Sequence, residues 1–196
     1  ITLTGMPGPG TTPKDLVLAM AAVLGAKGLL GHAAELYGPA IDALDLAGRV
    51  TVASMATEMG GIIALIPPSQ AIVDYCRART GQAFEPVFAD ADAEYAREIV
   101  IDVDGIGPQV ARPGHPDDAV DVSTLPPTRV DSVFIGSCTN GRLDDLRTAA
   151  AILEGKRIAP GVVLKIVPST RKVWEAALAE GLVKKLVDAG ALIGNA

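Results

Sequence analysis

Short apolar runs alternate with helical patterns through the last third of the chain, and this alternation restricts the possible folds more than any other feature. The order is strand, helix, strand, two helices and strand. The strands are expected at 132–135, 162–167 and 191–193, and the helices at 143–153, 170–179 and 182–189. Crossover helices of this length connect parallel strands. The sequence therefore predicts a parallel βαβαβ unit here.

The first hundred residues alternate in the same way, less regularly. Thr12 stands before Pro13 and three positions before Asp15, which is the arrangement of a helix N-terminus. Strands are expected at 33–37, 62–66 and 99–103, and helices at 12–25, 39–44, 50–59 and 69–79. From 107 to 129 prolines recur without an apolar period, which is typical of a connecting segment.

These patterns together predict an α/β fold made of two Rossmann-like αβα units, each with three layers and a largely parallel sheet. The first unit is expected over 1–107, a proline-rich connection over 108–129, and the second unit over 130–196.

Composition excludes several classes of protein. Hydrophobic residues make up 49% and charged residues 20%, so the chain can bury a core and is not disordered. Its net charge of −6 argues against a nucleic-acid surface. No run approaches the roughly 18 apolar residues of a membrane span, so we expect a cytoplasmic protein with no membrane partner. Strand-like runs at both ends, with no initiator methionine, lead us to expect a fragment of a longer polypeptide.

Cys138 is the main functional candidate. It lies between an apolar run and a helical pattern, at a predicted junction of strand and helix. A thiol there lies in the positive field of the helix dipole, and the thiolate is the form that binds iron or zinc. Parallel sheets place ligands at the carboxyl ends of their strands, where both the Cys138 loop and the segment 168–170 are expected. The only other cysteine, Cys76, is 62 positions away, so Cys138 cannot complete a metal site with a nearby cysteine.

The sequence Gly-Ser-Cys-Thr-Asn-Gly-Arg at 136–142, followed by Asp-Leu-Arg at 145–147, resembles the first cluster-cysteine motif of the aconitase superfamily, in its isopropylmalate dehydratase and homoaconitase branch. The segments 11–18, 35–38, 54–60, 89–95 and 108–111 also fit that branch, in the same order. The resemblance therefore covers nearly the whole chain.

The resemblance implies a hydro-lyase that uses a 4Fe-4S cluster to isomerise a small hydroxy di- or tricarboxylic acid by dehydration and rehydration. Cys138 matches the first of three cysteine ligands, and the other two belong to a C-x-x-C pair outside this chain. The implied catalytic residues are Glu58, which matches a glutamate beside the cluster, and Ser54, which stands where an asparagine is common. The cofactor-binding candidates around the cysteine are Ser137, Thr139, Asn140 and Arg142. A small swivelling-domain subunit is the implied protein partner.

Two other interpretations stay open. The first is a non-catalytic Rossmann-like module in which 138–141 binds an anion at a helix N-terminus, without a cluster. The second is a regulatory role in RNA binding, known for some members of the superfamily, which the acidic balance disfavours. Outside the motif, Cys76 is expected to pack within a helix, and His32 and His115 are expected to be solvated.

Overall fold

A computed structural model describes residues 1–136 and 138–195, and its internal contacts divide the chain into two units, Ile1–Leu125 and Pro126–Ala196. Ser137, a predicted cofactor-binding residue, lies outside the described residues. Each unit has its own cluster of buried apolar side chains.

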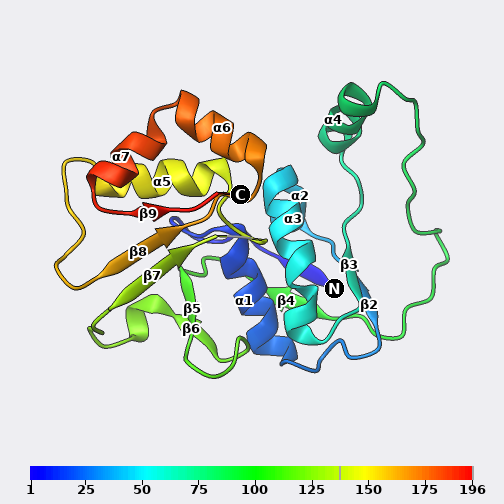
Figure 1. The fold of residues 1–196 in the computed structure, drawn as a ribbon. Helices are drawn as coiled ribbons and strands as arrows, with labels where there is room; N and C mark the ends of the chain where they lie inside the picture. The colour runs from blue at the N-terminus through cyan, green and yellow to red at the C-terminus, as the bar shows by residue number, and fades with distance from the viewer. Residues whose placement is uncertain (137, 196) are drawn as a thin grey trace. The chain divides into compact units, whose positions relative to one another are not determined.

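Unit 1 contains four short parallel strands, β1 (Thr2–Thr4), β2 (Ala33–Glu35), β3 (Ile63–Leu65) and β4 (Val100–Asp102). β1 pairs with β4, and β2 pairs with β3, in parallel. A parallel bridge between Thr2 and Tyr37 joins the two pairs, supported by the bond from the Leu3 amide to the Tyr37 carbonyl at 2.8 Å. β1 therefore lies between β4 and the end of β2 (Figure 1).

The helices of unit 1 are α1 (Pro13–Leu24), α2 (Pro39–Asp42), α3 (Leu46–Ser54), η1 (Met55–Met59) and α4 (Gln70–Thr80). Leu16, Val17 and Met20 of α1 enter the core. The predicted start of α1 is confirmed: Pro13 is its first residue, and the Asp15 carboxylate accepts from the Thr12 amide at 2.6 Å. The other Asp15 oxygen accepts from the Gln109 amide at 2.6 Å, so this buried carboxylate also holds a distant segment.

That distant segment lies within the range expected as a connection, and it contains regular structure. β5 (Gln109–Ala111) pairs with β6 (Ala119–Asp121) in an antiparallel hairpin that packs on α1, and η2 (Val122–Thr124) follows. Strands of three residues are too short to give a visible period of two. Arg112 and Asp118 close the hairpin with an ion pair.

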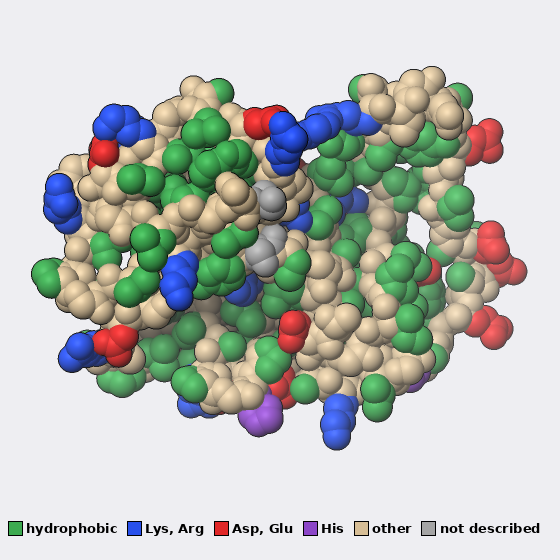
Figure 2. Space-filling model, in the orientation of Figure 1, with side chains coloured by type: hydrophobic (Ala, Val, Ile, Leu, Met, Phe, Trp, Pro, Cys, Tyr) green, Lys and Arg blue, Asp and Glu red, His purple; other side chains and the backbone are tan. Residues whose placement is uncertain are grey.

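α4 and the segment that follows it extend away from the strands of unit 1 (Figure 1). Val73 is the buried residue of α4. The segment 84–97 is irregular, and acidic side chains lie along its outer edge (Figure 2). The C-terminal end of this arm is held to the rest of unit 1, because the Tyr95 hydroxyl donates to Glu35 at 2.6 Å and Arg97 donates to the Gly28 carbonyl at 2.5 Å.

Unit 2 has the predicted order of elements. Its strands are β7 (Ser132–Ile135), β8 (Val163–Ile166) and β9 (Leu192–Ile193), paired in parallel in the order β7-β8-β9. Its helices are α5 (Leu143–Leu153), α6 (Arg171–Ala179) and α7 (Leu182–Asp188). The prediction of a parallel βαβαβ segment is confirmed.

The three helices of unit 2 cover one face of its sheet (Figure 1). Leu164 and Ile166 face these helices and are buried, whereas Phe134 and Leu192 on the opposite face are 58% and 60% exposed. The described part of unit 2 therefore has two layers, a mixed α/β arrangement with a small parallel sheet. The expected third layer is not present in it.

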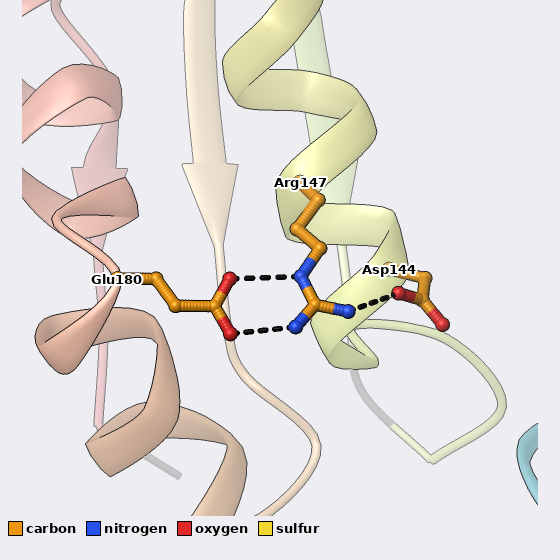
Figure 3. A network of polar contacts seen from close by, with 3 residues as sticks. All are labelled: Asp144, Arg147 and Glu180. Atoms are coloured by element: carbon orange, nitrogen blue, oxygen red, sulfur yellow. Dashed lines mark hydrogen bonds and ion pairs between the residues drawn. The ribbon is translucent and has the colours of Figure 1, made fainter.

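A polar network links the helices of unit 2 (Figure 3). Arg147 of α5 binds both carboxylate oxygens of Glu180, which follows α6, at 2.6 and 2.8 Å. Its third nitrogen donates to Asp144 at 2.7 Å. The bidentate pair lowers the pKa of Glu180. In the part of the chain that the structure describes, no helix is long and apolar enough to cross a membrane.

Candidate functional site

The Cys138 loop, residues 136–142, connects β7 to α5. Cys138 is exposed, and it precedes the first residue of α5, Leu143, by five positions. This is the junction of strand and helix that the sequence predicts. The loop begins and ends at glycines with positive φ, Gly136 at 155° and Gly141 at 77°.

The Cys138 loop lies against the turn that follows β8. The Val167 amide donates to the Ile135 carbonyl at 2.8 Å, and the Ser169 amide donates to the Gly141 carbonyl at 2.9 Å. A Cβ atom on Gly141 would lie 2.5 Å from the Val167 carbonyl oxygen, and one on Gly136 would lie 2.8 Å from it. Only glycine allows this approach of the two turns. The carboxyl ends of β7 and β8 thus meet at Cys138, as expected for a parallel sheet.

Hydrogen bonds from side chains of the loop and of the first turn of α5 hold the Cys138 loop. The Asp145 carboxylate accepts from the Arg142 amide at 2.9 Å and from the Asn140 side-chain amide at 3.5 Å. The Arg142 guanidinium donates to the Cys138 carbonyl at 3.2 Å. Thr139 donates to the Asn140 side-chain oxygen at 3.3 Å. Three predicted residues, Thr139, Asn140 and Arg142, therefore lie in one network with Cys138.

Two buried polar atoms near the loop have no hydrogen-bond partner among the described residues: Nε of Arg142 and Oγ of Ser169. An unsatisfied buried donor is costly unless a ligand completes it. An exposed thiol, a guanidinium and a hydroxyl suit an anionic group that a thiolate binds through sulfur. The residues present therefore fit an iron–sulfur cluster. Within the described residues, no group of three or more His, Cys, Asp or Glu could hold a metal ion.

Glu58 and Ser54 belong to unit 1. Ser54 is the last residue of α3, and its hydroxyl donates to the Thr51 carbonyl at 3.0 Å. Glu58 lies in η1, and both side chains are exposed. The helix expected over 50–59 is shorter at its end, because the chain tightens to a 3-10 helix at Met55 and stops at Gly60 with φ of 77°. The predicted catalytic residues therefore belong to unit 1, and Cys138 with its neighbours belongs to unit 2.

A feature of unit 1 that the sequence did not indicate is a cavity of about 300 Å³ beside β1, β2 and β4, with Glu35, Tyr37 and Tyr95 in its wall. Both tyrosine hydroxyls donate to one oxygen of Glu35, at 2.5 and 2.6 Å. These bonds lower the pKa of Glu35 and raise the pKa of both tyrosines. Glu35 and Tyr37 are two positions apart in the sequence, but no sequence pattern indicates that Tyr95, 60 positions from Glu35, contacts them.

Comparison with known proteins decides the family. Residues 1–129 and 123–196 match the model of the aconitase family (aconitate hydratase), which covers the whole chain. The chain belongs to the aconitase family. The resemblance found in the sequence is therefore confirmed.

The relatives of this aconitase-family chain include two 3-isopropylmalate dehydratase large subunits. The one from Sulfurihydrogenibium sp. is 44% identical over 93% of this chain and 42% of the relative. The one from Methanopyrus kandleri is 38% identical over 98% of this chain and 46% of the relative. A probable methanogen homoaconitase large subunit from Methanosarcina mazei is 40% identical, over 93% and 46%. The chain spans less than half the length of these relatives.

Proposed function

We propose that this chain is part of a hydro-lyase of the 3-isopropylmalate dehydratase and homoaconitase type, which isomerises a small hydroxy di- or tricarboxylic acid. The observation that carries the proposal is the Cys138 loop, which follows β7, lies against the turn after β8 and carries an exposed cysteine, in a chain of the aconitase family. The relatives' names include dehydratase and homoaconitase, so the substrate is proposed only as a class.

The cofactor of the proposal is a 4Fe-4S cluster. Cys138 would be one of its ligands, and Ser137, Thr139, Asn140 and Arg142 would surround it. Two further cysteines would come from outside this chain, since its other cysteine, Cys76, belongs to α4. When bound, such a cluster supplies a Lewis-acidic iron. The buried Nε of Arg142 has no partner among the described residues, which supports a role in donating to an anionic group at this point.

Glu58 is proposed as the catalytic group that accepts or returns a proton at the substrate hydroxyl. Its carboxylate is exposed and has no hydrogen bond or ion pair among the described residues, so it is available to a ligand. Ser54 is proposed to contact the same region, one turn earlier on the chain. Its hydroxyl, already donating to Thr51, can still accept a hydrogen bond.

The finer description of the fold is also part of the proposal. We propose that 1–107 and 130–196 are two Rossmann-like units joined through 108–129, and that further layers complete the sheets in the longer polypeptide. The parallel pairing of β1 with β4, of β2 with β3, and of β7 with β8 and β9 supports this. A small swivelling-domain subunit is the proposed partner, because the relatives are named large subunits, and the cytoplasm is the proposed location.

Anaerobic reconstitution tests the function. The full-length polypeptide, treated with iron and sulfide, is expected to develop the visible absorption of a 4Fe-4S cluster and to dehydrate hydroxy-polycarboxylates. Cys138→Ala should abolish both, whereas Cys76→Ala, on the exposed helix α4, should keep both. Cluster absorption that persists in Cys138→Ala would contradict the proposal.

A second candidate is the anion-binding module without a cluster. It is favoured by two buried atoms that have no partner in the described part of the chain, Nε of Arg142 and Oγ of Ser169, which would donate to a bound anion. Titration with citrate and phosphate distinguishes the candidates. Binding that is equal in the wild type and in Cys138→Ala, without reconstitution of a cluster, would favour the module.

A further inference from the structure

Asp145 occupies a central position at the start of α5. One of its carboxylate oxygens accepts from the Arg142 main-chain amide at 2.9 Å and from the Asn140 side-chain amide at 3.5 Å. These two donors lie on either side of Gly141, whose φ of 77° turns the chain into the helix. A single oxygen therefore holds the residues on both sides of Gly141.

The contacts continue from Asp145 to the cysteine. The main chain of Arg142 is held by Asp145, and its guanidinium donates to the Cys138 carbonyl at 3.2 Å. On the other side, Asn140 accepts from Thr139, the neighbour of Cys138. The loop has one further anchor, the bond from the Ser169 amide to the Gly141 carbonyl, which Asp145 does not touch. These contacts, from Arg142 and from Asn140, both lead back to the Asp145 carboxylate.

A simpler role for Asp145 would be to stabilise the helix through its dipole, as acidic residues in a first turn do. Asp144 is also in the first turn of α5 and carries the same charge, but its carboxylate is bound to Arg147 instead of the loop. Substituting each aspartate in turn therefore distinguishes the effect of a negative charge on the helix dipole from the effect of the contact with the loop. Arg142, at the N-cap, has no side-chain acceptor of its own, so the loop depends on Asp145 for this function.

We propose that Asp145 is the positioning residue of the Cys138 loop, which keeps the thiol presented for the cluster. This inference rests on the proposed function, in which Cys138 is a ligand of the cluster and its thiol has to be held in position. The contacts of Asp145 and Arg142 are nevertheless made within the chain, so the positioning can be measured without a cluster.

The first experiment uses amide hydrogen exchange in the metal-free chain, with the Ser169 amide as the reporter. The Ser169 amide donates to the Gly141 carbonyl, so its protection reports on the contact between the loop and the turn after β8. Asp145→Ala is expected to speed exchange at Ser169 about tenfold, the effect of one charge-assisted hydrogen bond. Asp145→Asn, which keeps an acceptor oxygen, should restore part of the protection. Asp144→Ala is the matched control and should match the wild type.

The second experiment follows the visible absorption of the reconstituted full-length polypeptide during incubation with an iron chelator. Asp145→Ala should lose the cluster several-fold faster than Asp144→Ala, with Asp145→Asn between them. Unchanged Ser169 exchange in Asp145→Ala, or equal exchange in the two alanine variants, would overturn the positioning role. If Asp145→Ala does not fold, Asp145→Asn against Asp144→Asn gives the same comparison. A wild type that forms no cluster would refute the proposed function and not the exchange result.

Discussion

Gly141 shows how a single residue determines the geometry of the candidate site. Its missing Cβ leaves room for the Val167 carbonyl oxygen, which a side chain would approach to 2.5 Å. Its φ of 77° is also unfavourable for any other residue. Position 141 therefore has to be glycine for two independent reasons, and both concern the contact between the Cys138 loop and the turn after β8.

We expect Gly141→Ala to destabilise unit 2 by about 3–5 kcal/mol, from the strain of a positive φ together with overpacking. Gly155 is a matched control, because its φ is 68° but no atom lies within 4 Å of the Cβ position. Gly155→Ala should cost only about 1–2 kcal/mol. Urea unfolding measures both. Equal costs would mean that the loop does not need to lie against Val167.

At this scale the sequence predicted the cysteine, its neighbours and the glycines around it, because they form one continuous motif. It did not predict that the Ser169 hydroxyl is buried without a partner among the described residues. That fact depends on how two turns meet, and these turns are separated in the chain by α5 and β8. The roles assigned to Glu58 and Ser54 stay predictions.

Among the elements, α5 and the end of α6 are joined by the pair of Arg147 and Glu180 (Figure 3). The pair lowers the pKa of Glu180 below its ordinary value of 4.5, so its contribution to stability is present above that pH. The contribution is lost as the pH falls through the lowered value of the folded state.

We therefore expect Glu180→Gln to be less stable than the wild type at pH 7 and equally stable at low pH, once the wild-type carboxyl is protonated. Thermal unfolding of both proteins across this pH range provides the measurement. Glu175→Gln is the control, since Glu175 pairs with Arg171 inside α6 and joins no second helix. A stability difference between Glu180→Gln and the wild type that does not change with pH would contradict the pairing.

The arm formed by α4 and the residues after it is held by few contacts. Tyr95→Phe removes the bond to Glu35 at the end of this arm, so we expect cleavage after Glu94 by a glutamate-specific protease to become several-fold faster. Tyr75→Phe is the control, because Tyr75 is an exposed residue of α4 that stacks with Arg79. Equal cleavage rates would mean that the Tyr95 hydroxyl does not hold the arm.

The elements of unit 2 were predictable because each has a clear period and a turn residue at its ends. The hairpin of β5 and β6 was not, since prolines at 113 and 116 in its turn indicate a connection when they are considered alone. The buried Asp15 carboxylate holds the hairpin, because it accepts a hydrogen bond from the Gln109 amide, 94 positions away in the sequence. A local pattern cannot reveal such a partner.

For the molecule as a whole, the two apolar clusters define where stability resides. Leu36 belongs to the cluster of unit 1 and Leu186 to that of unit 2, and both are almost completely buried. The residues of each cluster all come from a single unit. The alternation of strands and helices predicted two units, but not which face of the sheet in unit 2 would stay exposed.

Leu186→Ala is expected to cost about 2–5 kcal/mol, as a buried leucine does when a cavity replaces it. Amide exchange should then accelerate in α5, α7 and β8 and stay unchanged in α1. Leu36→Ala should give the opposite distribution. Faster exchange throughout the chain in both variants would show that the two clusters unfold together.

The position of β1 between β4 and the end of β2 has a consequence for synthesis of the protein. Thr2 pairs with Val100, so one edge of β1 has no partner until β4 has been translated. At about 5–20 residues per second, a ribosome needs about 5–20 seconds to make the intervening chain. During that time the nascent chain carries an open strand edge, to which a chaperone could bind.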